Sequence, residues 1–199
     1  TVSKQTLAAA GTAIRYHDGS TWQNAYTSLT DGAQVLMETW GATDKVYLAN
    51  GNEAPKSWSG SSLAALTGLT SAVAQFLAYQ DRLLYLSAAA PGELGWSNSF
   101  VDDAWSSGST TGVRPDSNLH GMVIHAAQVS DAGLAAKVLL AGANGMYLFS
   151  GNDLRTPATT GDYKVESLAT KYGCNAPLTM QWTPAGTIYL GTDKMVYIL

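Results

Sequence analysis

The sequence has a single cysteine, Cys174, few charged residues and no run of lysine or arginine. One cysteine excludes an internal disulfide, so apolar burial and backbone pairing must stabilise the chain. Eleven basic residues against fifteen acidic ones give a net charge of −4, and this disfavours nucleic-acid partners, which need clustered positive charge. No apolar stretch reaches the roughly 18 residues that span a bilayer, so we expect a soluble chain without a membrane segment.

Aromatic and aliphatic residues are plentiful, since 46% of the 199 residues are hydrophobic and six are tryptophan. This composition is typical of a packed domain and not of a disordered chain. Helical periodicity is scarce: the best candidate, residues 63–74, contains Gly68, and we interpret it as strand, turn and connection. We therefore predict an all-β fold, with residues 1–199 forming a single domain.

An internal repeat supports this prediction. Tyr47 and Tyr85 lie in similar short apolar strands 38 residues apart, and Trp58 and Trp96 share that offset. Related hairpins recur at spacings of roughly 40 to 55 residues, the range expected for the blades of a β-propeller. The hairpins beyond the first pair cover residues 6–19, 138–151 and 188–198.

Each hairpin has further strand candidates beside it, which suggests units of four strands. The upstream candidates are residues 34–40, 73–79, 121–127 and 178–182, and the downstream ones are 19–22 and 60–63. We predict a β-propeller of about five four-stranded blades, or a portion of a longer propeller protein. The first unit lacks an innermost strand and the last an outermost one. Either the two ends complete one blade or the missing strands belong to a longer polypeptide, and we favour the second alternative.

The order of several short motifs resembles that of propeller-bearing tail proteins of tailed bacteriophages, such as tail hub and tail nozzle components. The motifs are YHDGSTW (16–22), VYLANGNEAPKSWSG (46–60), QDRLLYL (80–86), YLFSG (147–151), YGCNAP (172–177) and GTIYL (186–190). The resemblance implies a non-enzymatic virion component, made in the host cytoplasm. It also implies a ring of copies, with six as the expected number, and neighbouring tail proteins as partners.

The sequence predicts no catalytic, metal or cofactor site. His120 and His125 are five residues apart in an expected strand, and His17 is remote, so a zinc site is disfavoured. A glycoside hydrolase needs two carboxylates a fixed distance apart. Asp102, Asp103 and Glu93 are the candidates for such a pair, but carboxylates in loops are usually solvated. Asp18 and the residues after it are best explained as a turn with a packed tryptophan. A propeller hydrolase is therefore the weakest of three functional hypotheses.

Two sets of residues are candidates for binding. Trp22, Trp58 and Trp96 are candidates for stacking on sugars, as in a lectin-like propeller that binds host surface glycan, although packing between blades explains them better. The polar insertion at residues 106–118 is expected to be a surface loop. Its candidate partner contacts are Ser107, Thr110, Arg114, Asp116 and Asn118. The leading hypothesis is a structural tail protein that acts as a rigid docking platform, and the alternative is a glycan-binding propeller.

Overall fold

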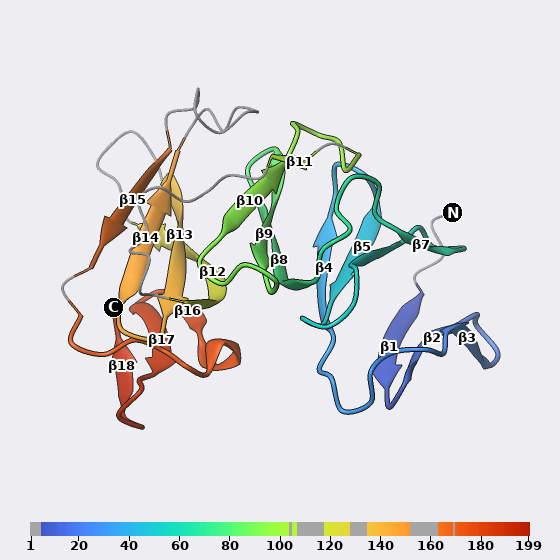
Figure 1. Ribbon diagram of the computed structural model, residues 1–199, viewed down its shortest axis with the longest axis horizontal. Coiled ribbons are helices and arrows are strands. Elements are labelled where there is room, and N and C mark those ends of the chain that lie inside the picture. Colours follow the sequence, from blue (N-terminus) through green and yellow to red (C-terminus); the bar gives the residue numbers. More distant parts are fainter. Residues whose placement is uncertain (1–4, 104, 107–117, 128–134, 152–162, 169) are drawn as a thin grey trace.

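The computed structural model describes residues 5–103, 105–106, 118–127, 135–151, 163–168 and 170–199. The described residues form an all-β fold of five antiparallel sheets, each of three or four strands. We name these sheets A to E in chain order. Figure 1 shows that they follow one another along an arc, with sheet A at one end and sheet E at the other.

Every sheet is a meander in which strands adjacent in the sequence pair. Sheet A contains β1 (Thr6–Ala10), β2 (Ala13–His17) and β3 (Trp22–Tyr26). Sheet B contains β4 (Leu36–Trp40), β5 (Lys45–Ala49), β6 (Lys56–Trp58) and β7 (Leu63–Ala65). Sheet C contains β8 (Val73–Tyr79), β9 (Arg82–Ser87), β10 (Leu94–Ser97) and β11 (Trp105–Ser106). Sheet D contains β12 (Leu119–Ala127), β13 (Ala135–Gly142), β14 (Met146–Ser150) and β15 (Lys164–Ser167). Sheet E contains β16 (Gln181–Thr183), β17 (Gly186–Leu190) and β18 (Val196–Ile198), preceded by the 3₁₀ turn η2 (Pro177–Thr179).

The strands agree with most of the expected segments. The segment that was the best helical candidate forms β7, a turn and the start of β8, as predicted. Gly68 in that turn has φ of 76°, and an added Cβ would lie 3.2 Å from the carbonyl oxygen of Asp103. The expected strand at residues 178–182 starts later, because η2 occupies its first part. Sheets A and E have three strands each in the described residues, in agreement with the two strands missing from the expected end units.

Four apolar clusters fill the gaps between successive sheets. We call the side of a sheet that packs toward the next sheet in the chain its forward face, and the opposite side its rear face. The cluster between A and B includes Ile14 and Trp58, and the cluster between B and C includes Tyr47 and Tyr85. The cluster between C and D includes Trp96 and Phe149, and the cluster between D and E includes Leu139 and Tyr189. The hydrophobic core is thus a series of four interfaces, each between sheets adjacent in the chain.

Polar side chains add connections across three of these interfaces. The Glu38 carboxylate on β4 accepts the backbone N–H of Ala78 on β8 at 2.9 Å. Gln75 on β8 donates to the carbonyl of Met122 at 2.8 Å and accepts its N–H at 2.9 Å. His125 on β12 and Thr187 on β17 are joined by a 2.8 Å hydrogen bond. These bonds satisfy groups that the apolar clusters would otherwise leave unpaired, and they fix the alignment of neighbouring sheets.

The 38-residue repeat offset holds from β5 to β6, where Val46 pairs with Trp58 as Leu84 pairs with Trp96, but it does not hold in the hairpin before them. Four residues connect β4 to β5, whereas two connect β8 to β9, so the first residue of β5, Lys45, corresponds to Arg82. In that hairpin the offset is therefore 37, and Tyr47 corresponds in its pairing to Leu84. A shift of one residue turns a side chain to the other face of a strand. Tyr47 lies on the forward face of sheet B and Tyr85 on the rear face of sheet C, so both enter one cluster.

Candidate functional site

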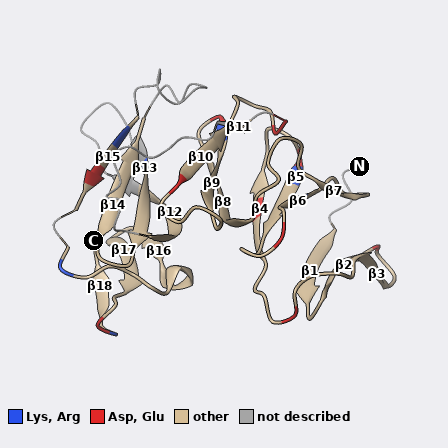
Figure 2. Ribbon diagram, in the orientation of Figure 1, with Lys and Arg blue, Asp and Glu red and all other residues tan. Residues whose placement is uncertain are grey.

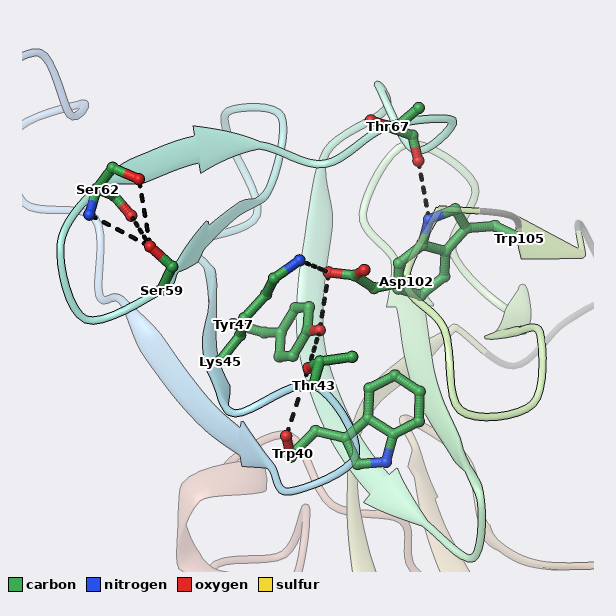
Figure 3. A network of polar contacts seen from close by, with 9 residues as sticks. All are labelled: Trp40, Thr43, Lys45, Tyr47, Ser59, Ser62, Thr67, Asp102 and Trp105. Carbon is green, nitrogen blue, oxygen red and sulfur yellow. Dashed lines mark hydrogen bonds and ion pairs between the residues drawn. The ribbon is translucent and has the colours of Figure 1, made fainter. Parts of the chain in front are cut away.

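The most connected polar group at a sheet boundary surrounds Asp102, in the segment that follows β10. Figure 3 shows Lys45 and Tyr47, from β5 of sheet B, pointing at this carboxylate. Lys45 Nζ lies 2.8 Å from Asp102 Oδ2, and the Tyr47 hydroxyl donates to the same oxygen at 2.9 Å. Thr43 Oγ1, in the β4–β5 turn, lies 2.6 Å from the Tyr47 hydroxyl oxygen. One carboxylate thereby joins β5 of sheet B to the segment between β10 and β11 of sheet C.

Burial controls the electrostatics of this group. The Tyr47 side chain is fully buried, and burial raises the pKa of its phenol far above the usual range, with the Asp102 hydrogen bond acting in the same direction. Tyr47 therefore remains a protonated donor at any physiological pH. The Lys45–Asp102 pair is partly open to water, with side-chain exposures of 32% and 15%. The group neutralises and orients charge at the sheet boundary, and it pairs no nucleophile with a general base.

A groove on sheet C borders the segment that connects β7 to β8. It is lined in part by Leu69, Ser71, Tyr85, Glu93 and Trp105. The Trp105 indole N–H donates to the carbonyl of Thr67 at 3.0 Å, and its ring meets Tyr85 edge to face at 5.8 Å. An aromatic wall beside a carboxylate is suited to a small polar ligand. Sequence reasoning missed Trp105 because it lies outside the hairpin repeat. Its position two residues after the Asp102–Asp103 pair was the available signal.

The three tryptophans singled out for sugar stacking occupy different environments. Trp58 is 4% exposed between sheets A and B, and Trp96 is fully buried between sheets C and D. Neither presents an open ring face, so the stacking hypothesis is wrong for these two and packing explains them. They pack on opposite sides of their sheets and not at equivalent positions. Trp22 is 49% exposed on sheet A.

The turn before Trp22 is organised by Asp18. Its Oδ1 accepts the backbone N–H of Ser20 at 2.9 Å and that of Thr21 at 2.8 Å, and its Oδ2 accepts from Gln23 at 3.0 Å. These N–H donors hold the pKa of the exposed Asp18 carboxyl far below its usual range. Trp22 itself meets the His17 ring edge to face, with centroids 5.4 Å apart. The expected turn is present, but its tryptophan is half exposed and not packed in the core.

The remaining candidate residues do not converge. Ser107, Thr110, Arg114 and Asp116 lie outside the described residues. Asn118 is exposed, just before β12, and its carbonyl accepts the N–H of Ala143 at 3.3 Å.

The other titratable groups are also separate. Glu93 accepts from the Tyr85 hydroxyl at 3.4 Å, just before β10, whereas Asp102 follows that strand. Burial, with a smaller effect of Lys137, lowers the pKa of His125. In the described part of the chain, no three His, Cys, Asp or Glu side chains are grouped so that they could hold a metal ion. Among those same residues, no helix has the length and apolar character needed to cross a membrane.

Comparison with known proteins gives no assignment. No protein-family model matches the sequence, and no curated protein matches it. A function can therefore be inferred only from the order of motifs in the sequence and from the geometry of the five sheets.

Proposed function

We propose that this chain is a non-enzymatic structural protein of a phage virion, a β-propeller module of a tail hub or nozzle that serves as a rigid docking platform. The observation that supports this most is the filling of all four gaps between successive sheets by apolar clusters. Close-packed interfaces of this kind resist deformation. A module of this construction is suited to holding partners in fixed positions.

The arrangement of strands favours blades of a propeller over independent sheets. β4 packs against β8, β8 against β12, and β12 against β16, so the first strands of sheets B to E succeed one another. In a propeller the first strand of each blade lies nearest the central axis. We infer that β4, β8, β12 and β16 are the inner strands of four blades and that sheet A is a blade without its inner strand.

The expected partners are copies of the same chain, six in a ring, and neighbouring tail proteins in the virion. Figure 2 shows few charged residues of either sign on the described strands. Such a surface favours contacts between protein surfaces over binding to a polyanion. The tail assignment itself rests on the motif order in the sequence.

The test is to express the chain together with the structural genes of the phage that encodes it and to purify the particles. We expect the protein in purified particles at a stoichiometry that is a multiple of the ring number, and density for a β-rich ring in electron cryomicroscopy. Virions that assemble and infect normally without this protein would refute the proposal.

A glycan-binding function is the second candidate, and the exposed Trp22 favours it. Trp22 sits beside the hydrogen-bonded Asp18 turn, where an open indole face adjoins polar side chains. Sugars stack on such faces while their hydroxyls bond to neighbouring polar groups. A glycan array tests this, with Trp22→Ala as the disrupting variant and Trp182→Ala, at a residue 39% exposed on sheet E, as the matched control. An array without hits, or equal binding by both variants, would remove this candidate.

A further inference from the structure

The groove on sheet C has the size and the lining of a small-molecule site. Its volume is about 410 Å³, and such sites measure roughly 300–1,000 Å³. The connection from β7 to β8 and the loop between β9 and β10 supply most of its lining. Leu69 is apolar, and Ser71 and Ser87 add hydroxyl groups. Among the lining residues that the structure describes, Glu93 is the one charged side chain.

The Glu93 carboxylate has no cationic partner among the described residues. Other carboxylates have one, since Asp102 is paired with Lys45 and Glu166 with Lys164. Glu93 is half-buried, and its Oε1 accepts the Tyr85 hydroxyl at 3.4 Å, beyond the usual range of about 2.5–3.0 Å. A carboxylate that has lost part of its hydration without gaining an opposite charge favours a cation from outside the chain.

Tyr85 connects this carboxylate to an aromatic wall. Gly95 lies opposite Tyr85 in the β9–β10 pair, and an added Cβ there would overlap the tyrosine ring. The ring therefore lies over Gly95, and its hydroxyl reaches Glu93. On its other side the ring meets Trp105 edge to face, with centroids 5.8 Å apart. The bond from the indole N–H to the Thr67 carbonyl fixes the orientation of Trp105 (Figure 3).

The charge of the groove selects among classes of ligand. Glu93 repels anions, and the described lining offers no cation to attract them. A metal ion such as Ca²⁺ needs six to eight oxygen ligands, and one carboxylate does not supply them. An organic ammonium ion fits better, because its N–H groups bond to a carboxylate while its apolar part and its charge both interact with aromatic rings.

We propose that this groove binds a primary alkylammonium group, with the nitrogen on the Glu93 carboxylate and the carbon chain along Trp105 and Leu69. The ligand is either a free amine or the lysine side chain of a protein partner, which share this chemistry. The site goes beyond the proposed function and does not depend on it. It lies between internal segments of sheets B and C, away from both ends of the chain.

The first test compares three ligands of equal chain length on the wild-type protein: pentylammonium, 1-pentanol and pentanoate. Each is titrated at neutral pH and constant ionic strength, and the tryptophan indole N–H signals are followed by NMR. The Trp105 signal is assigned as the one that Trp105→Phe lacks. We expect pentylammonium to shift this signal with a Kd on the order of 1 mM. The alcohol and the carboxylate should bind at least about tenfold more weakly, because neither forms a charge-assisted bond with Glu93.

The second test removes the charge. Glu93→Gln keeps the size of the side chain and should bind pentylammonium about tenfold more weakly, with no remaining preference over pentanol. Asp31→Asn is the matched control, since it makes the same change in net charge at an exposed residue between sheets A and B. This control should bind like wild type. If Glu93→Gln does not fold by circular dichroism, the comparison of the three ligands on wild type decides alone.

Three results would overturn the inference: no shift of the Trp105 signal at pentylammonium concentrations far above 1 mM, equal binding of pentanol or pentanoate, or Glu93→Gln binding like wild type. The two sources of the ammonium group are distinguished by titrating lysine blocked at both its α-amino and carboxyl groups. Tighter binding of blocked lysine than of pentylammonium supports a protein partner, and weaker binding supports a free amine. The virion test of the proposed function is independent of all these outcomes.

Discussion

Sheets A and E end the same series of interfaces, yet their uncovered faces differ. The rear face of sheet A presents alanine, arginine and a single half-exposed tryptophan, whereas the forward face of sheet E presents isoleucine and valine at up to 70% exposure. Of the two faces, that of sheet A is the more polar. Four pairs of substitutions compare covered and open positions in turn.

The largest effect is expected from tryptophan truncation in a covered cluster. Trp96 is fully buried between sheets C and D, so Trp96→Ala should lower the free energy of unfolding by about 3–5 kcal/mol. Trp22→Ala, on the open rear face of sheet A, should cost less than about 1 kcal/mol. Denaturant titration followed by circular dichroism measures both. Equal losses would mean that sheet A is covered in solution.

The next pair of substitutions compares residues at equivalent pairing positions on the forward faces of sheets D and E. Leu139 is fully buried and Ile188 is 37% exposed. Leu139→Ala should cost about 2–5 kcal/mol, and Ile188→Ala about 1 kcal/mol or less in the monomer. Thermal unfolding at several protein concentrations checks this. A cost for Ile188→Ala that grows with protein concentration would show that sheet E is covered in the oligomer.

A smaller effect is expected from the hydrogen bond between sheets B and C. Tyr47→Phe keeps the ring in its cluster and removes the hydroxyl that donates to Asp102 at 2.9 Å. Loss of this bond should cost about 1 kcal/mol, because Lys45 still pairs with the carboxylate. Tyr197→Phe, which removes the bond to Asp193 within sheet E, is the comparison and should cost less. The reverse order would contradict the role assigned to the Asp102 group.

The smallest effect concerns pH. Burial raises the pKa of Glu38 above its ordinary value of 4.5, although the Ala78 N–H partly offsets this. The contribution of Glu38 to stability is therefore fully present below pH 4.5 and is lost as the pH rises through the raised pKa. Glu38→Gln retains an acceptor for Ala78 without the charge. This variant should be more stable than wild type at neutral pH, by less than about 1 kcal/mol, and equal to it near pH 4.

Asp18→Asn, in an exposed turn of sheet A, should change the pH dependence of stability in the opposite direction. The pKa of Asp18 is lowered, so its contribution is present above its ordinary value of 3.8 and is lost as the pH falls. Unfolding titrations from acidic to neutral pH distinguish the two variants. A Glu38→Gln difference that does not vary with pH would show that the carboxylate is not the cause.

The sequence predicted the strands well because their signals are local. Alternating apolar residues and turn-forming Gly, Asn and Asp identified five hairpins, and the structure has a sheet at each. Residues 63–74, the best helical candidate, were interpreted correctly because Gly68 interrupts the pattern. Arrangement of the sheets in a closed propeller stays a prediction, as does the phage tail assignment.

Local sequence patterns did not determine which face of its sheet each side chain occupies. The repeat of Tyr47 and Trp58 at Tyr85 and Trp96 is genuine, but the lengths of the preceding turns differ by two residues. The strand register depends on both turn length and strand start, and a residue's face changes with every position. Local patterns also could not predict the Asp102 group. Asp102 is 57 residues from Lys45, and no periodic signal joins a loop residue to a strand so far away.

The succession of clusters also bears on how the chain acquires its structure during synthesis. The main contacts between sheets join neighbours in the sequence, so each sheet leaving the ribosome meets a forward face that has already formed. Stepwise growth of this kind limits the time that apolar strands spend without a cover. In the isolated chain, the amides of β18, whose Val196 and Ile198 side chains are exposed, should exchange with solvent before those of β13.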